Sequence, residues 1–235
     1  MPKLAEYKEL LRSYFGEQLD DWINEMGIRD DTELDDFILT SLYEKALKAF
    51  GLDRAVEILG EVNLLKGTIP IKLFVCGNPR VGKTSFCRRF ALGSFDKSYK
   101  TTIGVDFYSK HQIIERYLVR LVIWDLAGQE RFGLMRPNFY KGSSGGFVAF
   151  SLVDDKSFRD VPGWVKEVRD NLGEVPMLLI GTKSDLGVKI SGDPMKYVRE
   201  LGFMGYLNTS ALTGENINEA VRRLVKIILQ KEGLI

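Results

Sequence analysis

The stretch FVCGNPRVGKTSF, residues 74–86, contains a glycine-rich loop of the form G-x-x-x-x-G-K-T. In such a loop the backbone N–H groups encircle phosphate oxygens, and the helix that follows presents the positive end of its dipole to them. Gly77 and Gly82 allow a close approach that a Cβ would obstruct. Lys83 can neutralise the β- and γ-phosphates, and the hydroxyl of Thr84 can bind Mg²⁺. These residues predict a phosphate-binding loop.

Four further segments carry residues suited to the same chemistry. WDLAGQE, residues 124–130, ends an apolar strand with Asp125, which can reach a metal ion through water. SYKTTIGVDF at 98–107 precedes a strand, and GTKSD at 181–185 and NTSALTG at 208–214 end two others. Because open α/β sheets bind ligands outside the carboxyl ends of their strands, we expect these segments to meet at one site.

The elements that must position these segments alternate between short apolar strands and helices. The second and third strands are joined by so few residues that they must pair antiparallel. The pattern predicts an α/β fold with a six-stranded, mostly parallel sheet flanked by helices, the P-loop NTPase fold. The expected strands are 71–77, 105–114, 117–125, 145–153, 175–183 and 202–210, and the expected helices follow Lys83 and fill about 155–171, 193–201 and 215–231.

Residues 1–66 show no strand pattern and predict an α-helical extension to the domain of residues 67–235. One apolar stripe runs from Leu4 to Met26, a second helix starts with Thr32 as N-cap and Asp35 in the capping-box position, and a third covers about 52–65. The extension is either a small bundle packed on the main domain or a surface for a partner or a second copy. We expect the Asp pairs at 20–21, 30–31 and 35–36 to lie on the helix surface, without the spacing of a metal site.

Composition limits the classes of protein that the chain can belong to. It has 235 residues and a formal net charge of +1, so no overall field favours nucleic acid as a partner. Its two cysteines suit a reducing compartment, and we expect a cytoplasmic protein. With proline at position 2 and no cysteine near the last residue, we expect no covalent lipid anchor. His111, the only histidine, is expected to have a surface or packing role.

Together these segments resemble a small GTPase of the Ras superfamily, and the Rab branch in particular, over about residues 71–230. TIGVDF and WDLAGQERF are typical of that branch, and residues 1–66 lie outside the resemblance. The resemblance implies GTP and GDP as ligands, Mg²⁺ as cofactor, and effector, GTPase-activating and exchange proteins as partners. It also implies an effector surface made of Ile103, Phe107, Trp124 and Tyr140.

The same resemblance implies roles around the phosphates. Thr102 would close over the γ-phosphate and bind Mg²⁺ with Thr84, while Asp125 would reach the metal through water. Gly128 would donate its N–H to the γ-phosphate, and Gln129 would orient the attacking water. The catalytic residues implied are Gln129, Lys83 and Thr102.

Recognition of the base is implied by a second set of residues. Phe95 would lie against the guanine, and Lys183 along the base and ribose. Asp185 would accept the guanine N–H donors that adenine lacks, and Ala211 would donate its backbone N–H to the guanine carbonyl. The full nucleotide-binding set implied is Gly77, Asn78, Pro79, Arg80, Val81, Gly82, Lys83, Thr84, Ser85, Phe95, Tyr99, Thr102, Gly128, Thr182, Lys183, Asp185, Ser210, Ala211 and Leu212.

The chain departs from the family pattern at three places. Thr182 stands where most relatives have asparagine, which predicts weaker guanine binding because threonine lacks the amide fork. Leu212 replaces a common lysine without consequence, since the backbone reads the base there. Pro79 has no N–H, but it occupies a position that needs none. The side chain of Arg80 extends either into water or over the nucleotide, where it would act as a built-in cation.

The sequence therefore predicts a GTP-binding switch that hydrolyses GTP slowly, through two segments at about 96–102 and 126–136 that respond to the γ-phosphate. The alternative is an interaction module that holds the nucleotide and scarcely hydrolyses it, an alternative that Pro79 keeps open. In a second alternative, residues 1–66 are the functional end and the remaining domain regulates them.

Overall fold

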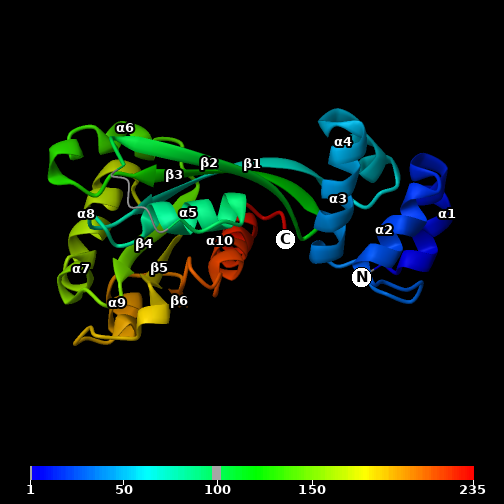
Figure 1. The fold of residues 1–235 in the computed structure, drawn as a ribbon. Coiled ribbons are helices and arrows are strands. Elements are labelled where there is room, and N and C mark those ends of the chain that lie inside the picture. Colours follow the sequence, from blue (N-terminus) through cyan, green and yellow to red (C-terminus); the bar gives the residue numbers. More distant parts are fainter. Residues whose placement is uncertain (1, 97–101) are drawn as a thin grey trace. The chain divides into compact units, whose positions relative to one another are not determined.

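The computed structural model describes residues 2–96 and 102–235 and shows two compact units (Figure 1). One unit contains Met1–Ile69 together with His111–Arg120, and the other contains Pro70–Lys110 and Leu121–Ile235. We call the first of these the helical unit. It is larger than an extension of residues 1–66, because it includes the segment His111–Arg120 from the middle of the chain. Within the described ranges, no helix has the length and apolar character required to cross a bilayer.

A six-stranded sheet in the order β2-β3-β1-β4-β5-β6 confirms the predicted fold class. Strand β4 pairs parallel with β1 and with β5, and β5 pairs parallel with β6. Only two residues separate β2 from β3, which makes that pair antiparallel. The strands are β1 (Gly67–Cys76), β2 (Val105–Ile114), β3 (Tyr117–Leu126), β4 (Gly145–Ser151), β5 (Met177–Thr182) and β6 (Tyr206–Thr209).

Strand β4 shows how helices cover both faces of this sheet. All of its side chains are buried, as expected for a central parallel strand. Phe147 packs against Phe86 on one face, with ring centroids 5.2 Å apart, and Phe150 packs against Phe158 on the other at 5.0 Å. The alternation of side chains along the strand thus joins α5 (Lys83–Leu92) and α7 (Asp155–Arg159) to opposite faces of the sheet.

The helices of this unit match the predicted ones except in two respects. The helix expected at 155–171 is two helices, α7 and α8 (Val161–Leu172), because Pro162 cannot continue a helix but fits the first turn of a new one. The short helix α6 (Arg136–Tyr140) and the 3-10 turns η1 (Glu130–Phe132) and η2 (Ser184–Leu186) were not predicted. The remaining helices are α9 (Pro194–Glu200) and α10 (Ile217–Lys231).

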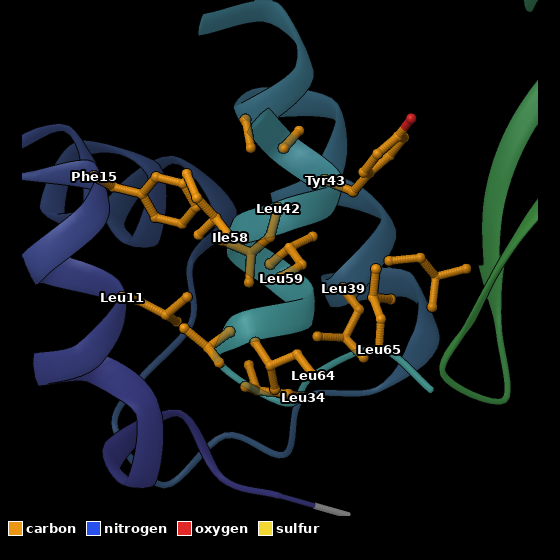
Figure 2. Close-up of a cluster of buried hydrophobic side chains, with 14 of the residues drawn as sticks. Leu11, Phe15, Leu34, Leu39, Leu42, Tyr43, Ile58, Leu59, Leu64 and Leu65 are labelled. Carbon is orange, nitrogen blue, oxygen red and sulfur yellow. The ribbon is translucent and has the colours of Figure 1, made fainter. Parts of the chain in front are cut away.

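The helical unit contains four helices among its described residues, where the sequence predicted three. They are α1 (Leu4–Phe15), α2 (Gln18–Met26), α3 (Asp36–Phe50) and α4 (Leu52–Glu61). The apolar stripe from Leu4 to Met26 is interrupted at Gly16, whose φ of 61° and ψ of −145° lie outside the helical region. Leucine, isoleucine and aromatic side chains from α1, α3 and α4 converge in the core of this unit (Figure 2).

The second helix predicted from the sequence corresponds to α3, and its predicted N-cap was wrong by three residues. Asp35, rather than Thr32, is the N-cap of α3, and its carboxylate accepts a 2.8 Å hydrogen bond from the Ile38 N–H. The Thr32 hydroxyl instead accepts a bond from the N–H of Arg29, within the preceding loop. Both residues are good caps, and the spacing to the first helical amides decides between them.

The turn between β2 and β3 is part of the core of the helical unit. Ile113 and Leu118, on either side of the turn, are completely buried with the helices. The turn residues Glu115 and Arg116 have positive φ of 52° and 67°, conformations that asparagine and glycine adopt more readily. The Asp36 carboxylate accepts both of their N–H groups, at 3.0 and 3.3 Å. The expectation that Asp36 lies on the surface was therefore wrong, because it is buried and holds a strained turn.

Of the two roles that the sequence left open for His111, surface or packing, the structure shows the packing role. Its Nδ1 forms a 2.8 Å hydrogen bond with the Tyr43 hydroxyl inside the helical unit. Burial, together with the positive charge of Arg120, lowers the pKa of His111. A neutral imidazole is therefore favoured at this position.

Candidate nucleotide-binding site

The glycine-rich loop lies between β1 and α5, as its sequence requires. A Cβ at Gly77 would lie 2.1 Å from the carbonyl oxygen of Ala149, so only glycine fits there. Gly82 is the N-cap of α5 with a φ of 107°, which also favours glycine. The Arg80 backbone is left-handed, with φ of 64°, and its carbonyl accepts a 2.8 Å hydrogen bond from Lys183 Nζ. The loop is thus held in one conformation from several directions.

Lys83 is buried beneath this loop. Its Nζ donates to the carbonyl oxygens of Gly77 at 2.8 Å and Asn78 at 2.9 Å. Burial lowers the pKa of the ammonium group, and the nearby Asp125 carboxylate acts in the opposite direction. A buried ammonium group with only neutral acceptors as hydrogen-bond partners is suited to receive an anion, because a phosphate would supply the missing negative charge.

Two hydroxyls and a carboxylate meet beside Lys83. Thr84 Oγ1 donates to Asp125 Oδ2 at 2.5 Å and lies 3.0 Å from Thr102 Oγ1. Asp125 is completely buried, and burial raises its pKa to about 6, while Lys83 and Thr84 act in the opposite direction. Its second oxygen, Oδ1, has no hydrogen-bond partner among the described residues.

This group of oxygen atoms fits a hard divalent cation. Mg²⁺ prefers oxygen ligands, retains several waters and is commonly bound through one or two carboxylates. Thr84, Thr102 and Asp125 offer such oxygens, and the unpartnered Oδ1 of Asp125 gives one of those waters a hydrogen-bond acceptor. Residues 2–96 and 102–235 contain no cluster of three or more His, Cys, Asp or Glu that could hold a metal, so this site would rely on one carboxylate and two hydroxyls. The structure thus brings together the three residues that the sequence predicted for this role.

Gly128 places the segment after β3 directly against the phosphate loop. A Cβ at this position would lie 2.3 Å from the carbonyl oxygen of Gly77 and 2.6 Å from the nitrogen of Pro79. The contact therefore requires glycine at 128 and sets Pro79 beside the segment that carries Gln129. Gln129 is half-buried, and its carbonyl accepts a hydrogen bond from Arg136.

A cavity of about 150 Å³ lies next to the loop and is bordered by the residues predicted to read the base. Asp185 is held there by a 2.5 Å hydrogen bond from the Ser210 hydroxyl to its Oδ1. The lining residues are Gly82, Ser85, Phe86, Phe95, Thr182, Lys183, Asp185, Leu186, Thr209, Ala211, Leu212 and Ile217. Phe86, Leu186, Thr209 and Ile217 are additions that only the fold could supply. Tyr99 lies outside the described residues.

Thr182 joins the base-reading segment to the phosphate loop. Its hydroxyl lies within hydrogen-bonding distance of the carbonyl oxygens of Val81 and of Phe150, the latter at 2.9 Å. The side chain is buried and borders the cavity, and its hydroxyl links β5 to the loop through these carbonyl groups. The weaker guanine binding expected from its lack of an amide fork stays a prediction.

The predicted effector surface needs one correction. Ile103 and Phe107 are 78% and 71% exposed, and the ring of Phe107 lies 6.3 Å from that of Trp124. Tyr140, by contrast, is completely buried, with its hydroxyl donating to Glu167. The neighbouring residue Phe139 packs against Trp124 instead, at 6.0 Å. Consecutive residues of α6 point to different sides, so the aromatic surface continues through Phe139.

Sequence reasoning missed a set of buried and half-buried polar residues behind the site. Arg136 pairs with Glu167, while Asp160 and Trp164 both form hydrogen bonds with Asn78 of the loop. Arg136 follows Leu134 by two residues in a segment without clear periodicity, so the sequence did not indicate that this arginine is buried. Trp164 is buried, and no local pattern predicted the hydrogen bond from its indole N–H to Asn78.

These features define a P-loop nucleotide-binding protein. The glycine-rich loop joins a strand to a helix above the buried Lys83, and oxygen atoms suited to a divalent cation lie beside it. The adjacent cavity is bordered by Asp185, whose carboxylate is held by Ser210. The comparisons with known proteins narrow this class. The Ras family model matches residues 72–230 of the chain.

Two curated relatives show the extent of the similarity. The Ras-related protein Rab-13 of Canis lupus familiaris is 36% identical over 166 residues, which cover 69% of this chain and 81% of that protein. The Ras-related protein Rab-7L1 of Rattus norvegicus is 40% identical over 163 residues, 66% of this chain and 80% of that protein. The chain therefore belongs to the Ras family of small GTPases and is Rab-like, as its sequence motifs predicted.

Proposed function

We propose that this protein is a GTP-binding switch that slowly hydrolyses GTP to GDP and phosphate. The observation that carries the proposal is the meeting of three features on one loop. Lys83 lies below the loop, the Thr84–Asp125 pair lies beside it, and Gly128 touches its backbone. Family membership supports GTP as the ligand.

Guanine would be selected by Asp185. Its carboxylate, oriented by the hydroxyl of Ser210, can accept two N–H groups from guanine, whereas adenine has no N–H donors at the matching positions and would leave the carboxylate without these bonds. Ala211 and Lys183 line the same cavity, and they would contact the guanine carbonyl and the plane of the base.

Hydrolysis would depend on positioning and on charge. Lys83 would neutralise the β- and γ-phosphates, the N–H of Gly128 would bond the γ-phosphate, and Gln129 would hold the attacking water in line. Thr84, Thr102 and Asp125 would hold Mg²⁺, which when bound neutralises charge on the phosphate oxygens. No residue near Gln129 is required as a general base. Without a partner's arginine we expect slow turnover, as in Ras, where the unaided rate is about 10⁻⁴ s⁻¹.

Switching would involve the two segments at 96–102 and 126–136, of which 97–101 lie outside the described residues. An effector would read the surface of Ile103, Phe107, Trp124 and Phe139 next to them. GTPase-activating and exchange proteins are the further partners that this function requires, and a role in signalling or vesicle trafficking agrees with the Rab-like family. A cytoplasmic location and the absence of a nucleic-acid partner stay predictions.

Nucleotide binding and turnover of the purified full chain test the proposal. GTP and GDP should bind more tightly than ATP. Asp185→Asn should reduce the affinity for guanine nucleotides about 100-fold, because the N–H group of the asparagine amide would then face the N–H groups of guanine. Single-turnover hydrolysis should be slower than about 1 s⁻¹ and should slow further with Gln129→Leu. Equal affinity for ATP and GTP would reject the proposed ligand.

The alternative function is a module that holds the nucleotide with little or no hydrolysis. The position of Pro79 favours it, because its ring adjoins Gly128, where an activating side chain would have to enter. Bound GTP that persists through long incubation, with no change on Gln129→Leu, would support the module. Residues 1–66 remain a proposed partner or dimer surface in either case.

A further inference from the structure

A guanidinium group lies buried behind the segment that carries Gln129. Arg136, at the start of α6, is only 6% exposed, and its guanidinium forms hydrogen bonds to groups inside the protein. Its Nη1 donates to the carbonyl oxygens of Ala127, at 3.3 Å, and Gln129, at 3.0 Å. Its Nε and Nη2 donate to the two carboxylate oxygens of Glu167, at 2.6 and 2.7 Å. One rigid side chain thus links α8 to the backbone on both sides of Gly128.

Helix α8 also holds the phosphate loop through the neighbouring side chains. The Trp164 ring lies 4.7 Å from the Arg136 guanidinium, and its Nε1 donates to Asn78 Oδ1 at 2.7 Å. The amide nitrogen of Asn78 donates in turn to Asp160, also at 2.7 Å. The same helix therefore fixes both the loop that would hold the phosphates and the segment that would hold the attacking water.

The geometry of the guanidinium explains why an arginine stands here. Its planar fork makes two parallel bonds to Glu167 while a third nitrogen reaches the carbonyls, an arrangement that the single nitrogen of lysine cannot reproduce. Tyr140 donates its hydroxyl to Glu167 at 3.0 Å, which further restricts the carboxylate. A carbonyl held in this way fixes the peptide from which the Gln129 side chain extends.

We propose that Arg136, held by Glu167, is a positioning residue for Gln129 in GTP hydrolysis. It acts through Gln129 and not on the phosphate, because its donors are used by Glu167 and by backbone carbonyls. The proposal rests on the hydrolysis proposed above. Small displacements of a water-positioning group lower the rate of a reaction much more than they lower ligand affinity, which is the property that the test uses.

Two conservative variants of the full chain test this role. Arg136→Lys and Glu167→Gln should each slow single-turnover GTP hydrolysis about 10- to 100-fold. The dissociation rates of GTP and GDP should stay within about threefold of the wild type, since neither side chain would contact nucleotide. Lys166→Met is the matched control on the same helix, because it removes an exposed pair with Asp170 and should leave the rate unchanged.

Combination with Gln129→Leu separates positioning from a general structural effect. If Arg136 acts through Gln129, then Arg136→Lys adds no further slowing in that background. A further slowing of about tenfold, or an equal loss of nucleotide affinity, would overturn the proposal. Unchanged hydrolysis in both single variants would overturn it as well, while leaving the GTPase function intact.

A second measurement tests the positioning role even if the wild-type chain does not hydrolyse GTP. That outcome would by itself reject the proposed function. Amide hydrogen exchange of residues 127–133, measured with GDP bound, reports the same restraint without chemistry. Exchange about tenfold faster in Glu167→Gln than in Lys166→Met would support the positioning role, and equal exchange would overturn it.

Discussion

Two buried aspartates serve the two units of this protein in different ways. Asp36, in the helical unit, accepts backbone N–H groups on both carboxylate oxygens, from Glu115 and Arg116. Asp125 lies in the other unit, Pro70–Lys110 and Leu121–Ile235, which we call the nucleotide unit. Its Oδ2 accepts hydrogen bonds from the hydroxyls of Thr84 and Thr102, while its Oδ1 has no partner among the residues described. Burying a carboxylate is costly unless its oxygens are bonded. A fully bonded aspartate therefore stabilises the fold, and an incompletely bonded one indicates where a ligand binds.

The largest effect is expected from deletion of residues 1–66. Ile113 and Leu118 are completely buried against the helices, and burial of two such side chains stabilises by about 3–6 kcal/mol. The truncated chain should therefore aggregate or unfold at lower urea than the full chain. Urea denaturation and light scattering measure these changes.

A rescue variant serves as the control for that deletion. Replacing both residues by threonine in the truncated chain, with Ile113→Thr and Leu118→Thr, keeps strand propensity and removes the apolar surface. This variant should recover solubility. A truncated chain that is monomeric and as stable as the full chain would show that residues 1–66 are an independent appendage.

The comparison of the two aspartates predicts opposite effects of the same substitution. Asp36→Asn should lower the free energy of unfolding by about 1–3 kcal/mol, because an amide nitrogen would then face a backbone donor. Asp125→Asn in the nucleotide-free chain should leave stability unchanged or raise it, because it removes a poorly bonded buried charge. The same variant should weaken nucleotide binding in the presence of Mg²⁺.

Urea titrations of both variants, with and without nucleotide, measure this contrast. An equal loss of stability in Asp36→Asn and Asp125→Asn would contradict the division between a structural and a ligand-binding carboxylate. The exposed Asp20, which pairs with Arg12 on the surface, offers a control whose change to asparagine should have little effect.

The smallest expected effect concerns pH. The pKa of His111 is below the ordinary value of 6.5, through burial and the charge of Arg120, so the unfolded chain binds this proton more readily than the folded one. Protonation of His111 therefore lowers the free energy of unfolding as the pH falls below about 6.5. His111→Gln keeps an acceptor for Tyr43 and should show a smaller loss of stability between pH 8 and pH 5, by urea denaturation, than the wild type. Identical losses in both chains would rule this contribution out.

Much of the nucleotide unit could be predicted because local patterns determine it. The run 105–114 became strand β2 with the predicted bounds, and the G-x-x-x-x-G-K-T spacing located the loop and the buried Lys83. Predictions failed where two nearby residues of similar type could each occupy the same structural position. Thr32 and Asp35 are both suitable caps, and Phe139 and Tyr140 are both aromatic, so only packing decides which residue caps the helix and which ring reaches the surface.

The sequence by itself determined the order of the strands along the chain and the segments that carry the candidate nucleotide-binding residues, because apolar alternation and motif spacing act over a few residues. The tertiary structure decided which distant residues meet. It brought Asp36 to the turn of β2 and β3, and Arg136 to Glu167. Buried polar groups take their partners from wherever the chain packs, and no local pattern encodes that choice.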